Sequence, residues 1–208
     1  MNLDGYEYVG LMVPGSVVTF VMTLLSPDIR DLVAKEGFDL GGFGVFVLVS
    51  LVVGFLVQAI GNWIEAVEKG LGTAPSERLR RGEGGIVSEE QFVRMRACLL
   101  SAGAGDPTEM TPKAWRSTQA EMAATIRAQG GSHRLDLFVR MYGLGRGLTS
   151  AFLLAICLTL LFPEAGAIRW RYILILAIGL ILSFARTRQF SEHYLRELVI
   201  GYLRTRSV

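Results

Sequence analysis

The chain has 208 residues, of which 51% are hydrophobic and 19% are charged, and its net charge is +2. So small a charge does not by itself indicate a nucleic-acid-binding protein. Two cysteines and two histidines do not make a disulfide framework or a metal site, so we expect no metal and no cofactor.

The first predicted membrane span covers residues 9–26, none of which is charged. Its polar side chains are Ser16, Thr19, Thr23 and Ser26, and their intervals of three, four and three place them on one helix face. Polar side chains in lipid face other helices or a water-filled cavity. Two interpretations stay open, namely hydrogen bonds between helices and the lining of a pore.

The second predicted span, residues 43–60, also lacks charge. Gln58, Asn62 and Glu65 form a polar stripe at its end, because residues four and three apart are neighbours on a helix. The stripe is either an ordinary helix end with one interhelical hydrogen bond or the polar mouth of a conduit. Without a catalytic partner, an active site is the weakest of the three interpretations.

Residues 65–139 are predicted to form a small helical insert between the second and third spans. Ser88 and Gln91 have the spacing of a capping box, which predicts a helix start. Pro112 suits the first turn of another helix, and Ser132 can cap a third. The residues expected to be buried in the first two helices are Phe92, Met95 and Leu99, then Trp115, Met122 and Ile126.

Five arginines of this insert are candidates for an anion pocket that binds a nucleotide or an acidic partner, because the guanidinium fork matches phosphate well. They are Arg78, Arg80, Arg81, Arg94 and Arg96. Solvated surface charge is the competing interpretation.

The third and fourth spans lie in residues 140–186, where the uncharged runs are shorter than the roughly 17–25 residues of a typical span. Flanking residues can anchor them at the headgroups, since arginine and tryptophan favour the interface. These anchors are Arg140, Arg146, Trp170, Arg171 and Arg186. Gly143, Gly145 and Gly147 precede the third run, and either a hinge or close helix packing would explain them.

The fourth span is predicted to continue through residues 187–208 as one helix. Phe190, Tyr194, Leu198 and Tyr202 recur at steps of four, so this stripe must be buried against the insert or another subunit. The spacing also predicts two i,i+4 pairs, Glu192 with Arg196 and His193 with Glu197.

Loop charges predict the orientation. Of 21 Lys and Arg residues, two lie in residues 27–40 and two in residues 163–171, and the others lie in residues 69–146 and after residue 185. Because cytoplasmic segments carry the Lys/Arg excess, both termini and residues 65–139 should be cytoplasmic in a bacterial inner membrane. The first two spans should lie within residues 1–64.

The chain lacks the H-E-x-x-H, P-loop and G-x-S-x-G motifs, so we expect no enzyme. Three stretches carry a resemblance, "QAIGNWIE" at 58–65, "RMYGLGR" at 140–146 and "RQFSEHYLREL" at 188–198. With the overall layout, they resemble small four-span bacterial inner-membrane proteins of anti-phage defence, either effectors or sensors. The resemblance implies an oligomer in which a signal at the cytoplasmic face triggers depolarisation or leakage.

The sequence therefore predicts an all-α integral membrane protein with four transmembrane helices and a small helical cytoplasmic domain. Our main hypothesis is a homo-oligomeric channel-like or membrane-disrupting effector, embedded in membrane lipid and gated by a cytoplasmic nucleotide signal or protein partner. The alternative is a non-conducting membrane-anchored sensor or scaffold that recruits a soluble cytoplasmic partner.

Overall fold

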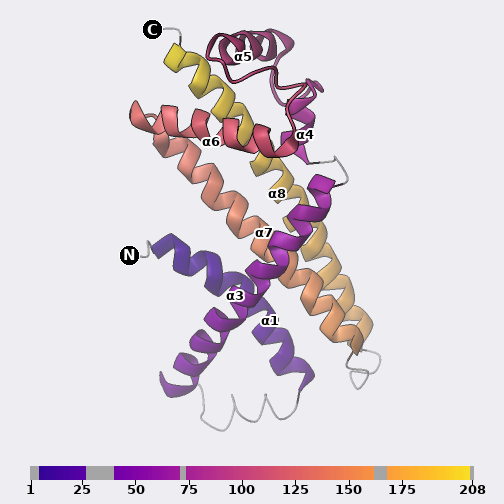
Figure 1. The fold of residues 1–208 in the computed structure, drawn as a ribbon. Coiled ribbons are helices and arrows are strands. Elements are labelled where there is room, and N and C mark those ends of the chain that lie inside the picture. The colour runs from indigo at the N-terminus through magenta and orange to yellow at the C-terminus, as the bar shows by residue number, and fades with distance from the viewer. Residues whose placement is uncertain (1–4, 27–39, 71–73, 162–167, 207–208) are drawn as a thin grey trace. The chain divides into compact units, whose positions relative to one another are not determined.

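The computed structural model describes residues 5–26, 40–70, 74–161 and 168–206, and within them every regular element is a helix (Figure 1). The elements are α1 (Gly5–Leu25), α3 (Leu40–Gly70), α4 (Pro75–Arg80), α5 (Glu89–Ser101), α6 (Pro112–Ala128), α7 (Ser132–Leu161) and α8 (Ile168–Arg206). The all-α prediction is confirmed.

Four helices, α1, α3, α7 and α8, are long and apolar enough to cross a membrane. The prediction of four spans is therefore confirmed at the level of length and composition. The two short apolar runs belong to much longer helices, since α7 has 30 residues and α8 has 39. At about 1.5 Å per residue, each exceeds the roughly 30 Å of a hydrocarbon core.

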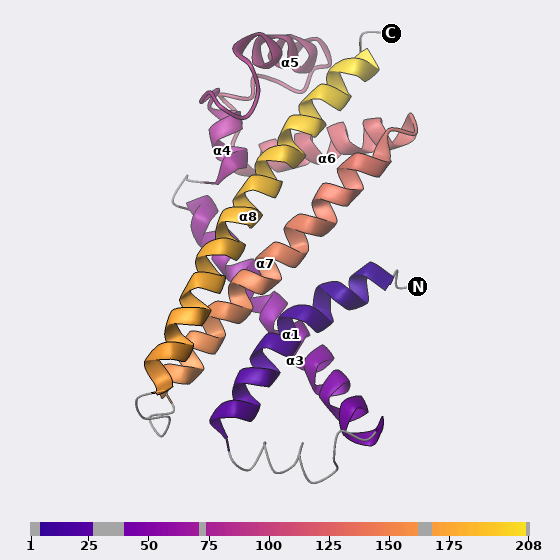
Figure 2. The same ribbon diagram turned by 180° about the vertical axis from the view of Figure 1, so that it is seen from behind.

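The chain divides into two compact units, which we call the first and the second unit. The first unit comprises Met1–Ile64 and Gly143–Thr187, and the second comprises Glu65–Tyr142 and Arg188–Val208. Each unit holds one of the two cysteines, an exposed Cys157 in the first and a half-buried Cys98 in the second. α7 and α8 lie side by side in both views (Figure 1, Figure 2).

Glycine allows the helices of the first unit to pack closely. A Cβ added at Gly15 of α1 would lie 2.7 Å from the amide nitrogen of Gly54 and would overlap the carbonyl oxygen of Ser50, both on α3. A Cβ at Gly54 would in turn overlap the carbonyl oxygen of Leu11. α1 and α3 therefore cross backbone to backbone, as small residues permit in membrane helices.

The second unit has its own hydrophobic core, contributed by α4, α5, α6, α7 and the end of α8. Trp115 is fully buried, and its indole Nε1 donates a hydrogen bond to the carbonyl oxygen of Ser76 at 3.0 Å, as a buried indole requires. The capping box at Ser88 and Gln91 is present, which confirms that predicted helix start. The other principal core residues are Leu79, Ile86, Met95, Leu99, Met122, Ala123, Ile126, Leu135, Leu195, Leu198, Val199, Tyr202 and Leu203.

The apolar stripe on the last part of α8 faces this core. Leu198 and Tyr202 are buried in it, and Tyr194 packs partly buried against it. Burial against the insert, one of the two predicted outcomes, therefore accounts for the stripe within a single copy of the chain.

The i,i+4 pairs predicted on this helix find other partners. Glu192 lies 3.3 Å from Arg78 and 3.9 Å from Arg188, while Arg196 Nε donates to the carbonyl oxygen of Ile86 at 3.0 Å. Arg78, which the fold brings close, and Arg188, one turn earlier on the same helix, thus replace Arg196 as the partners of Glu192.

The second predicted pair differs in the same way. His193 stacks on Phe138 of α7, with ring centroids 5.8 Å apart, and Glu197 lies 3.6 Å from Arg134. Both contacts join α7 to α8 within the second unit, which a pairing of His193 with Glu197 along one helix would not do.

Candidate functional site

The polar stripe of α1 makes its hydrogen bonds mainly within its own helix. Ser16 Oγ donates to the carbonyl oxygen of Val13 and Thr23 Oγ1 to that of Thr19, both at 2.9 Å. Such bonds to residue i−3 or i−4 satisfy a hydroxyl without any partner from another helix. Ser16, Thr23 and Ser26 are half-buried, whereas Thr19 is fully buried.

The polar stripe of α3 begins with a contact to α1. Gln58 is half-buried, and its Nε2 donates to the carbonyl oxygen of Gly10 at 3.4 Å. Asn62 is exposed, and the side chain of Glu65 lies outside the described part of the structure. One member of this stripe is thus used in helix packing, as the interhelical interpretation expects.

Two hydroxyls of the first unit are buried without a hydrogen-bond partner among the described residues. They are Thr19 Oγ1 on α1 and Ser50 Oγ on α3. Ser50 lies where α1 and α3 cross, since its carbonyl oxygen is the atom that a Cβ added at Gly15 would overlap. An unsatisfied buried hydroxyl costs about 1–3 kcal/mol, so each of these two groups destabilises the packing of the first unit locally.

The three glycines before the third apolar run have different surroundings. A Cβ at Gly145 would meet the side chain of Thr187, and a Cβ at Gly147 would lie 2.9 Å from Cγ of Pro14. Nothing lies within 4 Å of a Cβ added at Gly143. Close packing therefore accounts for Gly145 and Gly147, and the hinge interpretation stays a prediction for Gly143.

Four of the five candidate anion-binding arginines contact a carboxylate. Arg78 lies 3.8 Å from Glu83 in addition to its contact with Glu192. Arg81 lies 3.7 Å from Glu83. Arg78 also donates to the carbonyl oxygen of Gly84, and Arg94 is exposed. Arg78 and Arg81 thus share Glu83 after the end of α4, and Arg78 has a second acidic partner in Glu192 of α8.

Arg80 and Arg96 are fixed at different places. Arg80 is the last residue of α4, where its Nε donates to Glu77 at 2.8 Å and its Nη1 to the carbonyl oxygen of Met110 at 2.7 Å. Arg96 of α5 pairs with Asp106. The structure therefore brings Arg78 and Arg81 together at Glu83 but gives Arg80 and Arg96 separate acidic partners.

Asp106 is held in its charged form by its neighbours. Burial raises its pKa, but hydrogen bonds from the side chain and backbone of Thr108 and the charge of Arg96 outweigh that effect, so the pKa lies below its usual value. The carboxylate accepts from Thr108 N at 3.0 Å and from Thr108 Oγ1 at 2.8 Å. Asp106 thus fixes the turn between α5 and α6.

The predicted interfacial anchors lie mostly at the surface. Trp170, Arg171, Arg140 and Arg186 are exposed. Arg146 is half-buried, and a Cβ added at Gly61 would lie 3.3 Å from its Cγ, so its aliphatic stem packs on α3. Exposure of this kind is compatible with headgroup contact.

No cluster of three or more His, Cys, Asp or Glu side chains that could hold a metal ion occurs in the part of the chain that the structure describes.

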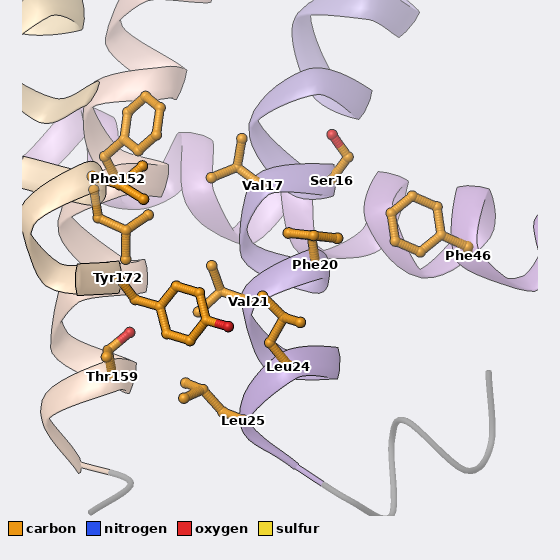
Figure 3. A pocket seen from close by; sticks show the side chains of 12 residues that line it. Ser16, Val17, Phe20, Val21, Leu24, Leu25, Phe46, Phe152, Thr159 and Tyr172 are labelled. Atoms are coloured by element: carbon orange, nitrogen blue, oxygen red, sulfur yellow. The ribbon is translucent and has the colours of Figure 1, made fainter. Parts of the chain in front are cut away.

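An apolar groove is the feature of the first unit that sequence reasoning missed. It has a volume of about 510 Å³ and is lined by residues from four helices (Figure 3). The lining residues are Ser16, Val17, Phe20, Val21, Leu24 and Leu25 of α1, Phe46 of α3, Phe152 and Thr159 of α7, and Tyr172, Ile175 and Leu176 of α8. Their apolar character follows from composition, but no sequence pattern indicates that four helices leave a hollow there.

The close contact between α1 and α3 at Gly15 and Gly54 was also missed, although the sequence contains a pattern that indicates it. Gly15 with Thr19, and Ser50 with Gly54, each place two small residues four apart. This spacing is typical of close helix contacts in membranes.

The fold and these contacts define a class, an all-helical chain with four candidate membrane-spanning helices. Comparisons with family models, curated proteins and solved structures found no match to the chain. Any function must therefore be argued from the residues themselves.

Proposed function

We propose that the chain is a membrane-anchored sensor or scaffold whose second unit recruits a soluble partner. The observation that carries this proposal is the hydrogen bond from Gln58 to the carbonyl oxygen of Gly10. It uses the first polar residue of the α3 stripe to join α3 to α1, where a conduit would need that side chain to face water. The separate core of the second unit supports a domain that can present a binding surface.

The experiment compares ion flux with stability. Wild type, a Gln58→Leu, Asn62→Leu double variant and an Ala59→Leu control at an exposed neighbouring position are expressed at equal levels in bacteria. A scaffold leaves the membrane potential unchanged in all three strains, and the double variant lowers the thermal stability of the purified protein. Depolarisation by wild type and not by the double variant would contradict the scaffold and favour ion flow along the stripe.

The second candidate is a gated homo-oligomeric conduit or membrane-disrupting effector. The unpartnered hydroxyls of Thr19 and Ser50 favour it, because a rearranged crossing that admitted water would satisfy both. Replacing Thr19 with valine and Ser50 with alanine would abolish depolarisation by a conduit, whereas a scaffold would become more stable or stay unchanged, because removing an unsatisfied polar group without adding volume is favourable.

The proposed location is the bacterial inner membrane, with both termini and the second unit in the cytoplasm. The Lys/Arg distribution supports this orientation. The resemblance to anti-phage proteins adds the proposal that the partner or nucleotide signal appears on infection. Phage plating on cells with and without the chain tests it, and equal plaque counts over a broad phage panel would count against it.

A further inference from the structure

The apolar groove of the first unit lies at one end of its four helices. It uses the C-terminal half of α1, the N-terminal part of α3, the C-terminal half of α7 and the first turns of α8 (Figure 1, Figure 3). From Ser16 to Leu25 it follows α1 for about 14 Å at about 1.5 Å per residue. That length is about half of a hydrocarbon core of roughly 30 Å, and therefore about one leaflet.

Two of the side chains that line the groove, Ser16 and Thr159, carry aliphatic hydroxyl groups. Ser16 Oγ donates to Val13, and Thr159 Oγ1 donates to the carbonyl oxygen of Ala155 at 2.8 Å. Both hydroxyls are thus already satisfied by their own helices. Apolar cavities of this kind do not hold water, because water needs two or more polar partners.

The end of the groove near the start of α8 has a different character. Figure 3 shows the ring of Tyr172 lying beside Val21 and the two leucines of α1, with its hydroxyl in the groove. The two preceding residues, Trp170 and Arg171, are exposed and are of the types that sit at lipid headgroups. An occupant of this groove therefore has a long apolar part and a polar end at the level of Tyr172.

The volume of the groove suits a small apolar ligand. It is about 510 Å³, which falls in the range of about 300–1,000 Å³ typical of ligand pockets. The length of the groove along α1 and its polar end at Tyr172 match one hydrocarbon chain joined to a headgroup. A helix from a second copy is the alternative occupant, and the crosslinking arm of the test detects it.

We propose that the groove binds one hydrocarbon chain of a membrane lipid, drawn from the leaflet at the C-terminal end of α1, with the lipid headgroup near Tyr172 and Arg171. This site depends on the membrane location of the helices and not on the sensor proposal, so the two can fail separately.

The test uses the full chain in lipid nanodiscs with a phospholipid that carries a photoreactive diazirine in its acyl chain. Labelled peptides are located by mass spectrometry. We expect label to concentrate in the groove-lining part of α1 and in the first turns of α8. Label on the exposed α3 positions Val52 and Leu56, which do not line the groove, should be weaker.

A matched pair of variants tests whether the groove itself is responsible. Ile175 lines the groove and is 63% exposed, whereas Ile181 lies on the same helix outside it and is 65% exposed. Ile175→Trp should fill the groove and reduce the labelling of α1 about fivefold or more, which corresponds to a loss of about 1 kcal/mol in the free energy of lipid binding. Ile181→Trp should leave the labelling unchanged.

Three results would overturn the proposal. The first is even labelling of all exposed apolar faces of the wild-type protein, which would indicate ordinary annular lipid. This result does not depend on the folding of any variant. The second is an equal response to both tryptophan variants when circular dichroism shows that both are folded. The third is a covalent dimer formed through a photoreactive amino acid at Phe20, which would place a second copy in the groove.

Discussion

Replacing Gly54 by alanine should loosen the first unit by separating α1 from α3. The added Cβ would overlap the carbonyl oxygen of Leu11 and would lie 2.9 Å from its carbonyl carbon. Both are backbone atoms, so no side-chain rotation can relieve the overlap and the two helices must move apart. Overpacking costs about 1–3 kcal/mol and occasionally more. The helix propensity of alanine returns up to about 1 kcal/mol. Because the overlap is with backbone atoms, the upper end of the overpacking cost applies, which leaves a net loss of about 2 kcal/mol.

The free energy of unfolding is measured by titrating sodium dodecyl sulfate into protein in mild detergent and following helicity and tryptophan fluorescence. Gly44→Ala is the matched control, because Gly44 is also on α3 and nothing lies within 4 Å of a Cβ added there. It should be neutral or slightly stabilising. If Gly54→Ala unfolds at the same detergent fraction as Gly44→Ala, the backbone contact between α1 and α3 is not present as described.

Three further predictions concern single side chains. Gln58→Leu removes a long hydrogen bond to Gly10, so it should lower the stability of the first unit by about 0.6 kcal/mol, the average for such bonds in a membrane protein, in the same detergent titration. Trp115→Ala should cost the second unit about 3–5 kcal/mol, whereas exposed Arg116→Ala should stay within about 0.5 kcal/mol, as measured by thermal unfolding. The folded-state pKa of Asp106 lies below its unfolded value, so its stabilising effect is complete above the unfolded pKa of about 3.9 and is lost as the pH falls through the folded pKa. Asp106→Asn should therefore flatten the acid limb of a plot of melting temperature against pH, and an unchanged slope would contradict the role assigned to this carboxylate.

Features set by neighbouring residues were predictable from the sequence. The capping box at Ser88 requires only a glutamine three residues later. Pro112 by itself indicates the start of a helix, because proline suits the first helical turn. The length of α8 was equally predictable, because its last part contains no proline and its apolar residues recur at a constant step of four.

Partners distant in sequence were not predictable in this way. Arg78 and Glu192 are 114 residues apart, and Gln58 and Gly10 are 48 apart. A helix periodicity gives the face on which Glu192 lies but not the residue that faces it, so the local rule proposed Arg196. The groove could not be predicted for the same reason, because it is formed by the packing of four helices and not by the residues of any one of them.

The two cysteines offer a built-in reporter for the organisation of the chain. Cys157 lies on the exposed face of a candidate membrane-spanning helix, while Cys98 is half-buried on α5 of the second unit. Under the proposed location, with α7 in the membrane and the second unit in water, a charged maleimide that cannot cross lipid should modify Cys98 from one side of a sealed vesicle and leave Cys157 unmodified from either side. The reaction of Cys98 should be slower than that of a fully exposed thiol, because Cys98 packs against the core of its unit. The side on which Cys98 reacts would then report the side of the membrane that the second unit occupies, without a change of any residue.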